Sequence, residues 1–121
     1  MIAVELSTST LATNDTTHLV PKFAAVAAAT SGNNTLVAAV TGKRIRVLAG
    51  SLTMTGTAVT IRFESAADGT ALTGLMTPLQ GTTIQLPFCV VGHFQTVSGE
   101  LLNLELGGAQ AVAGWIVYVE I

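Results

Sequence analysis

The segment at residues 31–65, SGNNTLVAAVTGKRIRVLAGSLTMTGTAVTIRFES, has the clearest β-strand patterns in the chain and decides its fold class. Between residues 43 and 55, Ile45 and Val47 alternate with Arg44 and Arg46, and a second apolar–polar alternation runs from residue 59 to residue 64. A period of two is typical of a strand with one buried face. The segment therefore predicts three strands, at 35–40, 43–55 and 59–64, joined by tight turns.

Glycines within this segment predict where the backbone changes direction. Ser31–Asn34 predicts a turn, since Gly and Asn tolerate positive φ, and further turns are expected at Thr41-Gly42 and Gly56. Gly50 lies inside a predicted strand, and the apolar residues after it have the opposite parity from those before it. Such a change predicts a β-bulge or a switch of facing near Gly50.

The remaining chain predicts further short strands separated by Gly- and Pro-containing turns. They are expected at 21–30, 71–76, 83–86, 100–106 and 112–121. The alanines of 21–30 also favour a helix, although its short alternating pattern favours a strand. The apolar segment 112–121 is expected to lie inside a sheet. Together these segments predict an all-β fold, an antiparallel β-sandwich or jelly roll of about 7–9 strands.

The domain organisation follows from composition. Residues 1–20 combine an apolar alternation at Ile2, Val4 and Leu6 with a Ser/Thr/Asn-rich stretch, which predicts an extended N-terminal arm or a frayed terminus. Residues 21–121 contain no linker or repeat and are expected to form a single β-sandwich domain.

Charge is scarce throughout the chain. Only 10% of the residues are charged, against about 25% in typical domains, and the net charge is −2. Such a surface suits permanent contact with other subunits, although a Thr-rich β domain that tolerates few charges is the alternative. The weakly acidic balance argues against nucleic-acid binding. Arg44 and Arg46 share a strand face and, with Arg62, are the candidate subunit contacts.

No apolar run is long enough for a membrane helix, and the N-terminus lacks a signal-peptide pattern, so we expect no membrane association and synthesis in a cytoplasm. The single cysteine excludes an internal disulfide.

Candidate catalytic and ligand-binding residues are few. Cys89 and His93 are four residues apart, which places them about 13 Å apart in an extended chain, and no third group orients the imidazole. His18 and His93 are isolated, so no metal site and no cofactor are predicted. We therefore expect no enzymatic activity. Trp115 and Tyr118 are interpreted as core or rim residues in preference to a carbohydrate-stacking platform.

Four elements of the sequence resemble those of small tailed-bacteriophage virion proteins, over about residues 23–121. They are Ser31–Asn34, Gly42–Val47, Gly99–Leu104 and Gly114–Tyr118. The resemblance implies a structural protein of the virion, with capsid decoration (cement) protein as the closest role. Such a protein would bind the major capsid protein on the capsid surface as a homodimer or homotrimer. A tail, neck or fibre-attachment component, or a carbohydrate-binding β-sandwich module, is the alternative.

Overall fold

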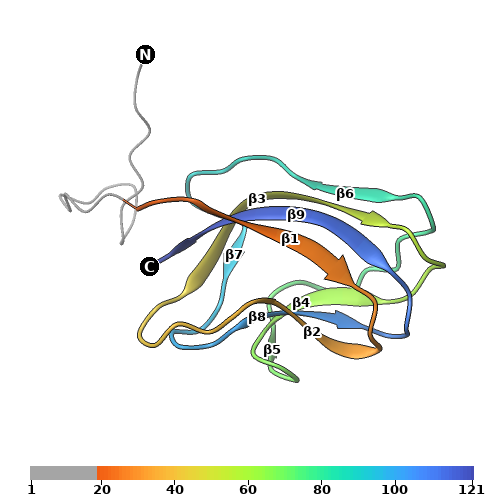
Figure 1. Cartoon of the computed structure of the whole chain (residues 1–121), viewed down its shortest axis with the longest axis horizontal. Helices are drawn as coiled ribbons and strands as arrows, with labels where there is room; N and C mark the ends of the chain where they lie inside the picture. Colours follow the sequence, from red (N-terminus) through yellow and green to blue (C-terminus); the bar gives the residue numbers. More distant parts are fainter. Residues whose placement is uncertain (1–18) are drawn as a thin grey trace, which may run out of the picture.

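The computed structural model describes residues 19–121, and the strands of this part form two antiparallel sheets packed face to face (Figure 1). The strands are β1 (Lys22–Ala28), β2 (Gly32–Val37), β3 (Ile45–Met54), β4 (Ile61–Ser65), β5 (Thr70–Ala71), β6 (Thr83–Leu86), β7 (Phe94–Gln95), β8 (Leu102–Leu106) and β9 (Val112–Glu120). No helix occurs among the described residues. The predicted all-β sandwich is confirmed, and the ambiguous segment 21–30 is a strand.

One layer, which we term the β9 sheet, has the strand order β1-β9-β3-β6, with the short β7 also paired to β3. The other layer, the β8 sheet, has the order β2-β8-β4-β5. Consecutive strands therefore alternate between layers along much of the chain. With β7 left aside, eight strands in two four-stranded sheets with this alternating order form a jelly roll.

The strand pairs are nested like those of one long hairpin. β1 pairs with β9, β2 with β8, β3 with β6 and β4 with β5, all antiparallel. The hairpin is wrapped on itself, because β9 also pairs with β3 and β8 also pairs with β4. These last two pairings join the halves of each sheet, so the C-terminal strand is internal, as the sequence predicted.

The tip of this nested hairpin is the turn between β4 and β5. Ala66 and Asp68 adopt positive φ, 68° and 54°, and the Asp68 N–H donates to Asn33 Oδ1 at 3.1 Å. Asp68-Gly69 thus has a conformational role, since Asp tolerates this backbone region better than most residues.

The two sheets enclose one continuous apolar core. Its largest buried side chains include Phe63, Leu104 and Ile116, each no more than 1% exposed. Phe63 from the β8 sheet packs on Phe94 from the β9 sheet with ring centroids 4.7 Å apart. Core packing therefore ties the two layers together directly.

One detail of the predicted three-strand segment is wrong. Strand β2 begins at Gly32, so Asn33 and Asn34 belong to a strand rather than to a turn. The pairing with β8 accounts for this, since Asn33 lies opposite Glu105 and Asn34 opposite Leu104. The turns of the segment connect the two layers, because β2 and β4 lie in the β8 sheet while β3 lies in the β9 sheet.

The predicted switch of facing in β3 exists, but it lies at Leu48, before Gly50. The register with β9 shifts between Val47 and Ala49, which allows residues of both parities to face the core. Gly50 is required for another reason. A Cβ at this position would lie 2.9 Å from the Trp115 carbonyl oxygen, so the close approach of β3 to β9 excludes a side chain there.

The predicted N-terminal arm lies outside the described residues, apart from Leu19 and Val20. The single domain predicted for residues 21–121 contains all nine strands.

We predict that Gly114→Ala destabilises the protein by about 3 kcal/mol, because a Cβ at this position would collide with the Ser51 carbonyl oxygen of the neighbouring strand. Urea unfolding followed by circular dichroism measures the change. Gly74→Ala is the matched control, since nothing lies within 4 Å of a Cβ there, and it should change stability by no more than about 1 kcal/mol. Equal unfolding midpoints for the two variants would contradict this packing.

Candidate interaction surface

The outer side of the β9 sheet carries an uncharged surface built from four strands, which we term the aromatic face. Strand alternation assigns residues to it, since their neighbours in sequence face the core. Its members are Phe23, Ala25 and Ala27 of β1, Ala113, Trp115 and Val117 of β9, Ala49, Ser51 and Thr53 of β3, and Thr83 and Gln85 of β6.

Two aromatic side chains project from this face. Phe23 is 81% exposed and Trp115 is 49% exposed, although burial of either ring would be favourable. Ala25 and Ser51 lie directly opposite Trp115 on the two adjacent strands, so small residues flank the indole on both sides. Exposed aromatic residues beside small ones, without charge, are typical of a surface that is covered in an assembly.

The interpretation of Trp115 as a core or rim residue is therefore wrong, because the side chain points outward. Ile116, the next residue, is fully buried and occupies the core side of β9. The interpretation is confirmed for Tyr118, which shares the parity of Ile116 and packs against the core. The sequence could not decide between the two sides, since both sets of alternate residues in β9 are apolar.

One end of the outer side of the β9 sheet is covered by other residues of the chain. Leu48 and Val119 are buried there in a cluster separate from the main core, with Leu19, Val90 and Ile121 packed around them. Over the aromatic face, residues 19–121 provide no such cover.

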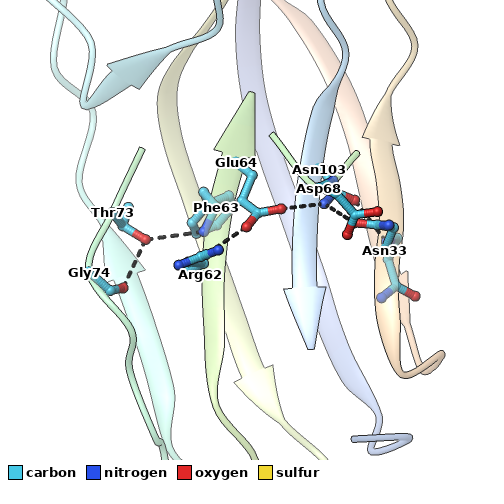
Figure 2. A network of polar contacts seen from close by, with 9 residues as sticks. Asn33, Arg62, Phe63, Glu64, Asp68, Thr73, Gly74 and Asn103 are labelled. Carbon is cyan, nitrogen blue, oxygen red and sulfur yellow. Dashed lines mark hydrogen bonds and ion pairs between the residues drawn. The ribbon is translucent and has the colours of Figure 1, made fainter. Parts of the chain in front are cut away.

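The outer side of the β8 sheet has a different chemistry, a network of polar side chains (Figure 2). Glu64 is fully buried, and its two oxygens accept separately, from Arg62 Nε at 2.6 Å and from Asn103 Nδ2 at 3.0 Å. Asn103 also donates to Asn33 Oδ1 at 2.8 Å. Because both carboxylate oxygens have partners, the network links strands β2, β8 and β4 and leaves Glu64 no free oxygen for acid–base chemistry.

Glu105 of β8 lies beside this network, opposite Arg62 on β4. A hydrogen bond with Glu64, burial and the negative charge of Glu64 raise the pKa of Glu105, and Arg62 offsets this in part. The Glu105 carboxyl therefore ionises less readily than an ordinary glutamate. Sequence reasoning missed this pair, since 41 positions separate the residues and only the β4–β8 pairing brings them together.

The three candidate contact arginines do not form one surface. Arg46 is partly buried and donates through Nε and Nη2 to Gln95 Oε1, at 3.0 and 2.9 Å. Arg44 is exposed at the same end of β3, and burial together with the charge of Arg44 lowers the pKa of Arg46. Arg62 lies on the other sheet and is held by Glu64. Whether these residues contact another subunit stays a prediction.

The structure does not assemble a reactive centre around Cys89 and His93. The Cys89 N–H donates to the Leu48 carbonyl, and the half-buried thiol is free. His93 is exposed, and its Nε2 lies 2.6 Å from the Pro87 carbonyl oxygen, a contact that suits the tautomer protonated at Nε2. Residues 19–121 contain no group of three or more His, Cys, Asp or Glu side chains that could hold a metal ion, and His18 lies outside this range. Within the same range, no helix is long and apolar enough to cross a membrane.

Comparison with known proteins supports the fold but no family. No family model matches the sequence, and no curated protein does. The fold is similar to that of a Bacillus endospore appendage protein, described as belonging to "a novel family of disulfide-linked pili". The TM-score is 0.51 at 17% sequence identity, over 84% of this chain and 86% of that one. At this identity the likeness concerns the fold alone.

We predict that Glu105→Gln is more stable than the wild type at pH 7. The raised pKa means that the folded state holds this proton more tightly than the unfolded chain, so the wild type loses stability as the pH rises above the ordinary value of about 4.3. Glutamine is neutral at every pH and should remove most of this loss.

Thermal unfolding between about pH 4 and pH 7 measures the effect. Glu120→Gln is the control, since the Glu120 carboxylate forms an accessible pair with Lys22 at 3.1 Å and should be worth no more than about 1 kcal/mol. A Glu105→Gln protein that is less stable than the wild type at pH 7 would show that the charged carboxylate is needed.

Proposed function

We propose that this chain is a structural subunit of a tailed-bacteriophage virion, with capsid decoration as its role. The observation that carries the proposal is the aromatic face, where Phe23 and Trp115 project from an uncharged sheet surface. A contiguous apolar surface of this kind is typical of a protein that works through contact with other subunits. Neither the polar network on the β8 sheet nor the Cys89 region offers a competing chemistry.

The virion itself is proposed from the resemblance of the turn and strand elements between residues 23 and 121. In this role the chain would bind the major capsid protein at the capsid surface and stabilise the lattice. The jelly roll suits such a task, because pairing of β9 with β3 and of β8 with β4 joins the two halves of each sheet. A rigid sandwich can bridge two neighbours without deforming.

A second candidate is a subunit of a filament such as a pilus or a phage tail. Its support is the fold similarity to the pilus protein of the endospore appendages. That protein is described as disulfide-linked, whereas Cys89 is the single cysteine among the 121 residues. One cysteine can join two copies at most, so a filament of this chain could not be linked from copy to copy by disulfides alone.

Binding to purified particles tests the proposal. Recombinant protein is mixed with expanded phage capsids that lack their decoration protein and centrifuged through sucrose, with isolated tails as the parallel sample. The proposal predicts co-sedimentation with capsids up to a fixed ratio and greater resistance of the capsids to heat. Binding to tails alone would move the role to the tail. Filaments formed by the protein alone would support the second candidate, and binding to neither particle would overturn the virion proposal.

A further inference from the structure

We propose that the aromatic face is a symmetric interface that is covered by the aromatic face of a second copy of this chain. The inference rests on the proposed role as an assembly subunit and adds the immediate partner. A two-fold axis through the β9 sheet would place Trp115 and Phe23 of each copy against the small residues of the other.

The distribution of charge favours a second copy over a charged partner. In a two-fold contact, residues at the axis meet their own counterparts while the others meet a different residue of the facing copy, so a charge near the axis would meet a like charge. None of the aromatic-face residues is charged. The charged residues of these strands, Lys22, Arg46 and Glu120, lie at the end of the sheet next to Phe23, outside the aromatic face, and Lys22 is paired there with Glu120.

The relief of the face is self-complementary. Trp115 is the largest projection, and its direct neighbours across the sheet are Ala25 and Ser51. The next row outward pairs Ala27 and Thr53 with Ala113, which leaves a low surface beside the indole. The indole of the facing copy can lie over this low row. By symmetry, the Trp115 indole of the first copy then lies over the low row of the facing copy.

The size of the face permits a specific but weak dimer. Four strands about 4.8 Å apart and roughly five residues long, at about 3.3 Å per residue, cover about 320 Å². Two copies would then bury roughly 800 Å² with the projecting rings included, in the range of weak, transient interfaces. A contact of this size is typical of weak association, so the titration is centred on micromolar concentrations.

Trp115 is the only tryptophan in the chain, so its fluorescence reports directly on this surface. The full-length protein is diluted from about 100 µM to about 0.1 µM, a range that brackets a micromolar dissociation constant, while sedimentation velocity records the mass. The proposal predicts conversion from dimer to monomer, with a shift of the Trp115 emission to longer wavelength over the same concentrations.

Variants locate the contact. Phe23→Asp and Ser51→Glu, on different strands, should each weaken dimerisation at least tenfold, since each would bury two uncompensated charges, one per copy, in an interface that has none. Leu75→Asp is the matched control, because Leu75 is 63% exposed and precedes the residue that bridges to β4, on the other sheet. Circular dichroism confirms that each variant is folded.

A protein that is monomeric at every concentration would overturn the proposal, and so would a dimer that both charge variants leave intact or a dimer that Leu75→Asp disrupts equally. These outcomes are independent of the virion proposal. A dimer that binds no particle would refute only the virion role, whereas a monomer that binds capsids would refute only the symmetric interface.

Discussion

The pairing of β9 with both β1 and β3 is the interaction on which the rest of the structure depends. This strand comes last in the chain, yet it holds the first strand on one side and the longest strand on the other. Without it, the nested hairpin could not wrap into two four-stranded layers, and the core between Phe63 and Ile116 would lose one wall. The close pairing of β9 with β3 explains two glycines, because Gly50 and Gly114 lie where these strands approach too closely for a side chain.

The same strand determines the surface chemistry. Because Ile116 and Tyr118 face the core, Trp115 and Val117 must face outward. The outer side of the β9 sheet is consequently apolar. The outer side of the β8 sheet carries the Glu64 network and Glu105, whose pKa is raised. The part of the chain that the structure describes thus has one satisfied polar face and one apolar face that none of its own segments covers. This asymmetry is the physical basis for the proposal that the protein acts within an assembly.

The strand pattern was sufficient to predict the fold class and the strands around Ile45, Ile84 and Trp115. Local alternation could not show which strands pair, since β1 and β9 are far apart in the sequence and meet only through the wrapped topology. The turn expected at Asn33-Asn34 failed because these amides bond within the strand and to its neighbours. The aromatic face escaped prediction for a related reason: when both sides of a strand are apolar, periodicity does not distinguish core from surface. Scarce charge was the signal that did point to an assembly.

The central claim is that the aromatic face is covered when the protein performs its role. Hydroxyl-radical footprinting with mass spectrometry measures this directly, by comparing the oxidation of Phe23 and Trp115 in dilute protein and in the assembled particle. The account predicts strong protection of both residues in the particle. Leu75 on the other sheet serves as the reference within the same molecule. Equal oxidation of Phe23 and Trp115 in the two states would contradict the claim.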